Sequence, residues 1–482
     1  MIQIINAFLG LIFTILESIF SGIGNIALSS VKTRRNEMYN ADFLNPDKVF
    51  LFVDEGYCYG DKSVSIDMSM MNALTIGNSG SGKSSSVLIN SILKMTTSSL
   101  IVHDPSFELH QETSGAKKQQ GYYTKVINYN TPHLGEKYNP LKRVGKSKTE
   151  IKQISKLLVE TTLGTSKGEI FWNESAINLI AFFVTYTLFY TDESKHTIAE
   201  VYSLLNLFAG NFKKVDELIV RLNDELMLQE YKSIVAMDQK LIMNVVATAK
   251  TSLSLWADEN IKELTQDDTL DFESFRNQKT ILYIKSDINQ MKYYRPLTSI
   301  FFEQFFAFTM REIPPNNSLK IFHLIDEASS LYLPMLSIAI SNVRKYSSGI
   351  HTIWQTQNQI IDLYGVQQAR NIISNSFIKC YLPGIELNTA RELEIMCGKY
   401  EFTDDEGHTK IRPLLTADEI RILDESLIFI GNKPVIKMKL IPYYNQKKLL
   451  ALSQLEPVSL TNLYSNKEDS ANTQMAKDEE EK

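Results

Sequence analysis

The sequence predicts an α/β protein with a mainly parallel sheet, into which an all-α domain is inserted. From about residue 40, short apolar runs alternate with helical stretches, as in strands joined by crossover helices. Between about residues 141 and 278 only helical periodicity is found, which indicates a separate helical insertion. A chain of 482 residues with 44% hydrophobic residues can bury cores in more than one domain.

The charge and cysteine content of the chain bear on nucleic-acid binding, metal binding and redox compartment. The 50 basic and 56 acidic residues give a net charge of -6, so composition alone does not indicate a nucleic-acid-binding protein. The three cysteines, Cys58, Cys380 and Cys397, are far apart and not spaced like metal ligands. We therefore expect free thiols, no zinc site and a reducing compartment.

The N-terminal residues 1–31 contain no Lys or Arg, and only Glu17 is charged. A secretory signal begins with positive charge, so that interpretation is rejected. We prefer a single membrane-spanning helix, with Lys32, Arg34 and Arg35 marking the cytoplasmic side and the bulk of the chain in the cytoplasm. An in-plane amphipathic helix, which normally carries basic residues on its polar face, and a buried helix are the alternatives.

The remaining elements follow from local patterns. Strands are predicted at 71–77, 100–105, 125–130, 280–285, 321–326, 351–355 and 377–382, and paired edge strands within 427–444. Helices of the insertion are predicted at 173–190, 197–210 and 239–256. The expected organisation is a membrane helix (1–31), the α/β domain in two parts (32–140 and 279–456), the all-α insertion (141–278) and a disordered acidic tail (457–482).

The stretch "GNSGSGKSS" follows the first of these strands and begins an apolar-periodic helix, which is the context of a P-loop. Its glycines allow successive N–H groups to surround phosphate oxygens, so the α/β domain is predicted to bind ATP. Lys83 would contact the β- and γ-phosphates and Ser84 would be a ligand of Mg²⁺. The predicted cofactor-binding residues are Gly77, Asn78, Ser79, Gly80, Ser81, Gly82, Lys83, Ser84 and Ser85. A Gly/Ser-rich surface turn is the alternative.

Two adjacent carboxylates end the strand "IFHLIDEA". In P-loop ATPases a second strand beside the P-loop strand ends in a carboxylate that holds Mg²⁺, and Asp326 fits that position. Glu327 is predicted to be the general base that activates water, which favours a motor ATPase over a small-molecule kinase. The alternative is a pair of solvated acids.

Two further residues, Arg344 and Gln355, both C-terminal to this strand, complete the predicted site. Gln355 ends the next strand, where it can sense the γ-phosphate or the attacking water. Arg344 lies before that strand and is a candidate arginine finger for a neighbouring subunit. A surface salt bridge is the alternative for Arg344.

Together these motifs resemble those of the TraG/TraD-type coupling proteins of type IV secretion systems, which are RecA-like DNA-pumping P-loop ATPases. The similarity extends from about Asn72 to Tyr444 and includes "GNSGSGKS", "HDPSFEL", "KYNPL", "FWNESAINLIAFF", "HLIDEASSL", "NVRKYSSGIHTIWQTQNQIIDLYG" and "RPLLTADEIRIL". The resemblance implies a homo-hexamer beneath a secretion channel. It also implies that the all-α domain faces DNA and relaxosome proteins.

By position, the resemblance implies that 77–84 is Walker A, that Asp326 and Glu327 are Walker B, that Gln355 is the sensor and that Arg344 is the candidate finger. The sequence departs from the family at two places. Ser106 stands where the family usually has a Lys after Asp-Pro. Residues 1–31 are too short for the two transmembrane helices that many members carry.

A basic segment at the start of the helical insertion is a candidate DNA contact. It includes Lys142, Arg143, Lys146, Lys148, Lys152 and Lys156. Phosphate contact there would be independent of base sequence and sensitive to salt. A solvated helix end is the alternative. Phe171 and Trp172, which could stack on bases, are instead expected in the core.

The main functional hypothesis is therefore a membrane-anchored, Mg²⁺-dependent coupling ATPase that links relaxase-bound DNA to a type IV secretion channel. One alternative is a receptor that docks secreted substrates with little motor activity. Another is a DNA translocase of the same fold that acts in segregation.

Overall fold

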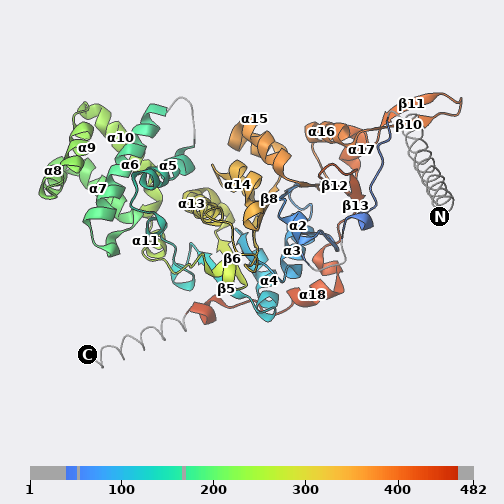
Figure 1. The fold of residues 1–482 in the computed structure, drawn as a ribbon, viewed down its shortest axis with the longest axis horizontal. Helices are drawn as coiled ribbons and strands as arrows, with labels where there is room; N and C mark the ends of the chain where they lie inside the picture. Colours follow the sequence, from blue (N-terminus) through green and yellow to red (C-terminus); the bar gives the residue numbers. More distant parts are fainter. Residues whose placement is uncertain (1–38, 51–54, 165–169, 465–482) are drawn as a thin grey trace, which may run out of the picture.

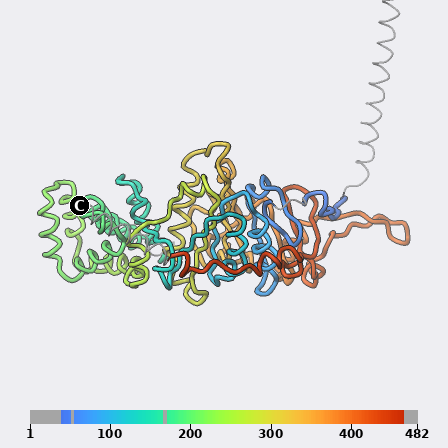
Figure 2. Tube along the Cα trace, turned by 90° about the horizontal axis from the view of Figure 1, so that it is seen from below, coloured from blue at the N-terminus to red at the C-terminus, as the bar shows by residue number. Residues whose placement is uncertain are grey.

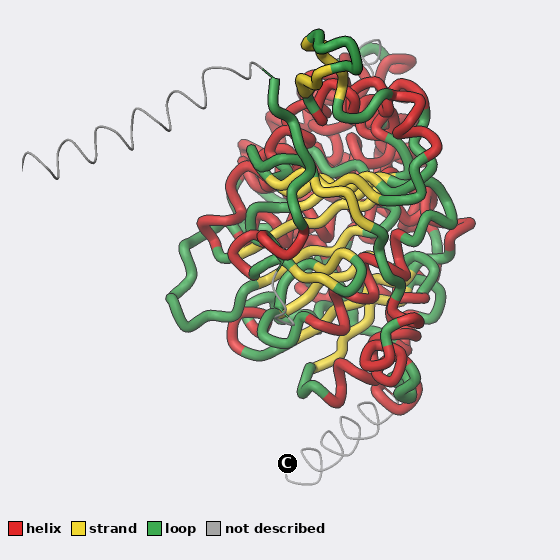
Figure 3. The backbone as a smooth tube through the Cα atoms, turned by 90° about the vertical axis from the view of Figure 1, so that its right-hand side faces the viewer, coloured by secondary structure: helices red, strands yellow, loops and turns green. Residues whose placement is uncertain are grey.

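A computed structural model describes residues 39–50, 55–164 and 170–464. Its centre is a nine-stranded sheet with helices on both faces (Figures 1 and 3). The strand order is β13-β12-β9-β3-β8-β7-β4-β6-β5, and the seven strands from β9 to β5 pair in parallel. The predicted α/β class with a mainly parallel sheet is confirmed.

All seven predicted parallel strands form. They are β3 (Ala73–Ile76), β4 (Ser99–His103), β5 (Tyr123–Asn128), β6 (Thr280–Lys285), β7 (Ile321–Ile325), β8 (Ser348–Trp354) and β9 (Ile378–Tyr381). The edge strands β12 (Ser426–Ile430) and β13 (Ile436–Met438) pair antiparallel, as expected for 427–444.

Successive residues of a central strand enter different cores, because side chains alternate between the two faces of a sheet. In β7, Ile321 and Ile325 join one apolar cluster, whereas Phe322 and Leu324 join the other. Every residue of β7 is buried. A strand covered on both sides reads as a continuous apolar run, which explains the pattern "IFHLI".

Different helices cover the two faces of the sheet. Residues of α3 (Ile89–Lys94), α4 (Glu108–Gln119) and α18 (Lys447–Ser453) pack in one cluster. Residues of α13 (Met291–Thr309), α14 (Leu336–Asn342), α15 (Gln357–Asn375), α16 (Leu387–Cys397) and α17 (Ala417–Ile422) pack in the other. The short helix α2 (Ile66–Ser69) and the two-residue strands β1 (Cys58–Tyr59) and β2 (Lys62–Ser63) precede β3.

Between β5 and β6 the described residues form helices and no strand, and α5 to α11 gather at one end of the molecule (Figure 1). The helices are α5 (Lys148–Leu163), α6 (Ile170–Tyr190), α7 (Ile198–Gly210), α8 (Phe212–Arg221), α9 (Glu225–Val235), α10 (Gln239–Ser252), α11 (Glu259–Thr265) and α12 (Ser274–Asn277). Their core, with Phe183, Phe208 and Trp256, is continuous with one core of the sheet. Trp172 packs against it, but Phe171 is 56% exposed, so a core role for Phe171 is wrong.

At the opposite end of the molecule, β10 (Lys399–Thr403) and β11 (Thr409–Pro413) form a protruding hairpin that the sequence analysis did not predict (Figure 1). Asn40 forms a bridge with Tyr400, so the first described residues lie beside this hairpin. The hairpin carries few buried residues, which removes the alternation signal on which strand prediction depends.

The expected disordered tail from residue 457 needs correction. Val458 donates its N–H to Ser114 Oγ at 2.9 Å, and Tyr464 is 5% exposed with its hydroxyl accepting from Val126 N–H at 3.0 Å. The segment after α18 therefore lies against α4 and β5, along the side of the molecule that faces the viewer in Figure 2. The buried Tyr464 and the hydrogen bonds to Ser114 and Val126 hold in place a polar segment whose composition predicts disorder. Residues 465–482 lie outside the described residues.

The expected location at the cell membrane is also corrected. Over residues 39–50, 55–164 and 170–464, no helix is both long enough and apolar enough to cross a membrane. The apolar helix α6 is 21 residues long, but ten of its residues are buried within the helical insertion. Its apolar side chains therefore form part of a protein core. Residues 1–31, on which the expectation depended, lie outside the described residues.

Candidate nucleotide site

The P-loop is the turn between β3 and the helix that continues into α3. Gly80 and Gly82 have φ values of 76° and 92°, a region that favours glycine. A Cβ on Gly77 would lie 2.8 Å from Leu382 Cβ, so the backbone there is packed too closely for a side chain. The helix begins with a π-helical turn over Lys83–Leu88. These features form the tight, glycine-dependent turn that the sequence predicts.

Lys83 is held inside this turn. It is 8% exposed, and its Nζ donates to the carbonyl oxygens of Gly77 at 2.8 Å and Asn78 at 2.9 Å. An ammonium group has three donors, so one remains for a phosphate oxygen. Ser81 Oγ is buried without a hydrogen-bond partner among the described residues. The Lys83 donor and the Ser81 hydroxyl therefore fit a polyphosphate in the P-loop.

The sheet order places β8 between the P-loop strand β3 and the strand β7 that ends at Asp326. The expectation that these two strands are neighbours is wrong. The carboxyl ends of parallel strands meet at one edge of a sheet, so the residue after β8 lies between the P-loop and the two acids. That residue is Gln355, whose Nε2 donates to the Glu327 carboxylate at 3.2 and 3.4 Å.

Asp326 and Glu327 have different environments although they are adjacent. Asp326 is 8% exposed, and burial, together with the Glu327 charge, raises its pKa to about 7, whereas the Glu327 N–H at 3.0 Å and the Lys83 charge act in the opposite direction. Glu327 is half-buried and has φ 45° and ψ 50°, in the left-handed region. Such a backbone conformation at a non-glycine residue is strained and occurs preferentially at functional sites.

A second buried carboxylate, which the sequence analysis did not identify, lies at the same sheet edge. Asp104 follows β4, is fully buried, and accepts from the N–H groups of Leu109 at 3.2 Å and His110 at 2.7 Å. Burial raises its pKa to about 7, and the Asp326 charge contributes in the same direction. The signal in the sequence was the position of Asp104 near the end of a predicted strand, as for Asp326.

The backbone of the Walker B turn is fixed by His103. Burial lowers the pKa of His103 to about 4, so its ring is neutral, and Nδ1 donates to the Asp326 carbonyl oxygen at 2.6 Å. Nearby, Ser106 replaces the lysine expected from the family. Ser106 is exposed, and its hydroxyl accepts from the Glu108 N–H at 3.4 Å, so this position supplies no positive charge.

Arg344 does not join the other predicted residues. It lies in a 3-10 turn over Val343–Tyr346, immediately before β8, whereas Gln355 lies immediately after β8. Arg344 therefore lies at the amino-terminal ends of the parallel strands, and Gln355 lies at their carboxyl-terminal ends. Arg344 is exposed, and no ion pair of Arg344 is found within the described ranges. A role as an arginine finger in a neighbouring subunit remains a prediction.

The basic segment at the start of the insertion is largely neutralised. Four of its members have acidic partners: Lys142 pairs with Asp267, Arg143 with Asp268 at 2.7 Å, Lys148 with Glu230 at 3.0 Å and Lys156 with Glu160 at 3.6 Å. The Arg143 guanidinium also lies 3.6 Å from the centroid of the Phe272 ring. Among the described residues, only Lys146 and Lys152 of this segment lack an ion pair.

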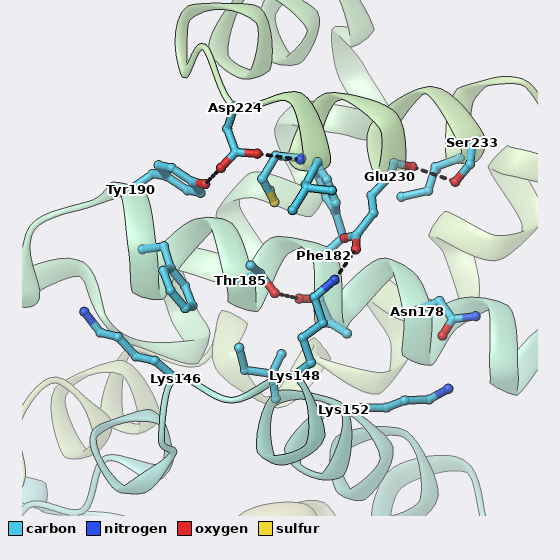
Figure 4. A pocket seen from close by; sticks show the side chains of 16 residues that line it. Lys146, Lys148, Lys152, Asn178, Phe182, Thr185, Tyr190, Asp224, Glu230 and Ser233 are labelled. Carbon is cyan, nitrogen blue, oxygen red and sulfur yellow. Dashed lines mark hydrogen bonds and ion pairs between the residues drawn. The ribbon is translucent and has the colours of Figure 1, made fainter.

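These lysines border a pocket of about 510 Å³ between α5, α6 and α9. Figure 4 shows Lys146, Lys148 and Lys152 on the α5 side and Asp224 and Glu230 on the opposite side. Its lining also includes apolar side chains, among them Phe182 of α6 and Met227 of α9. The pocket belongs to the insertion and shares no residue with the P-loop.

The fold and site together have the arrangement of a P-loop nucleotide-binding domain, with β8 between the P-loop strand β3 and the strand β7 that ends at the two acids. Comparison with known proteins identifies the family. The family described as Type IV secretory system Conjugative DNA transfer matches residues 25–467, so this chain belongs to it. The resemblance inferred from the sequence motifs is confirmed.

Relatives and solved structures agree with this assignment. The chain is 23% identical to Protein VirD4 of Rhizobium radiobacter, covering 81% of this chain and 59% of that protein, and 22% identical to Protein VirD4 of Agrobacterium fabrum, covering 81% and 62%. It therefore spans only about three-fifths of these relatives.

The fold is also that of solved coupling-protein structures. The bacterial conjugative coupling protein TrwBdeltaN70 superposes with a TM-score of 0.68 at 17% identity, covering 84% of this chain and 94% of that one. TrwB in complex with ADP and Mg²⁺ gives a TM-score of 0.67 at 16% identity, with the same coverage.

Proposed function

We propose that this protein is a coupling ATPase that binds ATP and Mg²⁺ and drives the transfer of relaxase-bound DNA to a type IV secretion channel. The observation that carries the proposal is the convergence of Lys83, Glu327 and Gln355 at one sheet edge in a member of the conjugative DNA transfer family. TrwB, which shares this fold, has been solved with ADP and Mg²⁺ and with a non-hydrolysable ATP analogue.

The residues of the site fit these ligands. The N–H groups of 77–85 and the free donor of Lys83 would hold the phosphates, and Ser84 and Asp326 would hold Mg²⁺. Bound Mg²⁺ would neutralise charge on the phosphate oxygens. Burial disfavours the charged form of Asp326, and a divalent cation favours it, so the site is electrostatically prepared for a cation.

Glu327 and Gln355 have complementary roles in this proposal. The Glu327 carboxylate accepts a proton from the attacking water, and the Gln355 amide, which donates to that carboxylate, restricts its orientation. The left-handed backbone of Glu327 directs the side chain away from the path of β7. Arg344, at the opposite sheet edge, would act only on the nucleotide of a neighbouring subunit in a homo-hexamer.

The proposed partners are DNA, relaxase or relaxosome proteins, and the components of the secretion channel. Lys146 and Lys152 are the members of the basic segment that remain available for sequence-independent phosphate contacts. This proposal narrows the DNA contact from six residues to two.

The test combines nucleotide binding with DNA transfer in the full chain. Lys83→Ala should lower the affinity for Mg²⁺-ATP at least about tenfold, because it removes a charge-assisted contact with the phosphates. Lys118→Ala, which removes an exposed lysine from α4, is the charge-matched control and should bind ATP like the wild type. Both variants are then assayed for conjugative DNA transfer.

The outcomes separate the motor from the alternative of a docking receptor. Loss of both binding and transfer in Lys83→Ala supports the proposal. Transfer that persists without nucleotide binding shows that ATP hydrolysis is not essential and favours a receptor. A wild-type chain that folds and does not bind ATP would reject the assignment of 77–85.

A further inference from the structure

Three side chains of α13 hold the segment that follows Glu327, and Tyr364 of α15 also accepts from the Leu333 N–H at 3.2 Å. Residues 328–335 connect the Walker B acids to α14. Arg295 Nε donates to the Ser330 carbonyl oxygen at 2.9 Å, and Ser299 Oγ accepts from the Tyr332 N–H at 3.2 Å. Glu303 Oε1 accepts from the Met335 N–H at 2.9 Å. All three side chains belong to α13.

These side chains form one continuous face of α13. They are spaced four residues apart, and residues at that spacing lie above one another on a helix. Their three contacts follow the order of the chain, at residues 330, 332 and 335. We call Arg295, Ser299 and Glu303 the coupling face. A shift of the turn after Glu327 must therefore either break these bonds or displace α13.

The other side of α13 contacts the chain that leads into the helical insertion. The Thr298 hydroxyl lies 2.8 Å from the Tyr129 hydroxyl. Gln304 accepts from the Tyr138 hydroxyl and donates to the Pro140 carbonyl oxygen at 2.9 Å. At about 100° per residue, 298 and 304 lie away from the coupling face. One helix therefore joins the Walker B segment to residues 129–140.

Glu303 is the member of the coupling face closest to the insertion. It is 1% exposed, and its Oε2 has no hydrogen-bond partner among the described residues. Helix α5 packs against α13, and the charge of Glu160 in α5 contributes to raising the pKa of Glu303. A carboxyl group buried with one oxygen unpaired is costly, which makes the position an unusual one for a purely structural residue.

We propose that Arg295, Ser299 and Glu303 are positioning residues that transmit the nucleotide-dependent movement of the turn after Glu327 through α13 to the start of the helical insertion. The proposal deepens the proposed ATPase function and rests on it. It gives the motor a physical connection between its nucleotide site and the domain that it would move. Such a connection requires an element whose position both sites influence, and α13 is the candidate because it hydrogen-bonds to both segments.

The test measures amide hydrogen exchange in the full chain, with and without Mg²⁺ and a non-hydrolysable ATP analogue, together with the affinity for that analogue. In the wild type, the analogue should alter exchange in 328–335 and also in 129–140. Ser299→Ala and Glu303→Leu each remove one acceptor of the coupling face. Each should reduce the response in 129–140 about fivefold, while 328–335 still responds and affinity stays within about twofold.

Two further variants separate coupling from a general loss of packing. Glu303→Gln keeps the acceptor for the Met335 N–H and should retain the wild-type response in 129–140. Ala307→Ser changes an exposed position of α13 and should also retain it. If Glu303→Leu does not fold, Ser299→Ala still decides the question.

The opposite results would overturn the proposal. A full response of 129–140 in Ser299→Ala or in a folded Glu303→Leu would show that the coupling face does not carry the signal. So would a wild-type chain that binds the analogue and responds only in 328–335. A wild-type chain that does not bind the analogue would reject the proposed function, and this proposal with it.

Discussion

Charged side chains have different environments at the carboxyl-terminal end of the parallel strands, where the candidate nucleotide site lies, and at the start of the helical insertion. At the sheet edge, Lys83, Asp104 and Asp326 are buried and hydrogen-bond to backbone groups of the same turn or helix start. In the insertion, Lys142 and Arg143 are paired with Asp267 and Asp268, 125 residues away in the sequence. Buried ionisable groups gathered at one end of a sheet are expected at functional sites, whereas an exposed ion pair such as Lys142–Asp267 contributes little.

The largest test of this comparison is Glu327→Gln, which keeps the shape of the side chain and removes the base. We expect kcat for ATP hydrolysis to fall at least about a hundredfold, the usual contribution of a general base, with ATP still bound. Steady-state hydrolysis and equilibrium binding measure the two effects separately.

The matched control is Glu425→Gln. Glu425 pairs with Lys437 at 3.2 Å beside the edge strands, and this ion pair involves no residue of the P-loop. It should hydrolyse ATP like the wild type. Hydrolysis by Glu327→Gln at the wild-type rate would show that another group, for example the buried Asp104, activates water.

A smaller effect is expected at Gln355, which touches the Glu327 carboxylate without being the base. Gln355→Ala should lower kcat roughly tenfold, less than the loss of the base itself, with little change in ATP affinity. Gln367→Ala, at an exposed position of α15, is the control. An unchanged kcat in Gln355→Ala would mean that Glu327 does not need this hydrogen bond for its orientation.

The sequence predicted the grouping of residues at the candidate nucleotide site better than the contacts of the helical insertion. The reason is the separation in sequence between the residues that make each contact. The P-loop, Asp326 and Gln355 each follow a strand, so local patterns and the rule for parallel sheets bring them together. The insertion of β8 between β3 and β7 depends on pairing between distant strands, which no local pattern encodes.

Long-range pairing also explains why the sequence did not reveal that most of the basic segment is neutralised by acidic partners. Lys142 and Arg143 are close to other basic residues in the sequence, and their acidic partners become neighbours only in the fold. Likewise, the order of residues 457–464 depends on Ser114, Val126 and Tyr464, which a compositional argument cannot anticipate.

The comparison also predicts which lysines bind DNA. Lys146→Ala with Lys152→Ala should lower the slope of log affinity against log salt by about 1.4 on single-stranded DNA, since each phosphate contact contributes about 0.7. Affinity at low salt should fall several-fold. The measurement is fluorescence anisotropy over a series of salt concentrations.

The control is the pair Lys142→Ala with Arg143→Ala, whose side chains are already neutralised. It should change the slope little. An equal decrease in both double variants would show that the ion pairs open on DNA and that the whole basic segment forms the contact.

The smallest expected effect concerns Glu303, which lies between the two regions. Burial raises its pKa to about 8, and Glu160 of α5 adds to the shift, while the Met335 N–H opposes it. Tyr364 of α15 and Arg295 of α13 are the other titratable groups at this junction. The folded state holds the proton more tightly than the unfolded state, so the stability that Glu303 contributes is present at low pH and is lost as pH rises through about 8.

Between about pH 7 and about pH 9, the wild type should lose roughly 1 kcal/mol more of its free energy of unfolding than Glu303→Gln, measured by urea denaturation. Parallel profiles would mean that water reaches the Glu303 carboxylate and that the junction between the sheet and the insertion is open in solution. The contact between Glu303 and the Met335 N–H would then not connect the two regions.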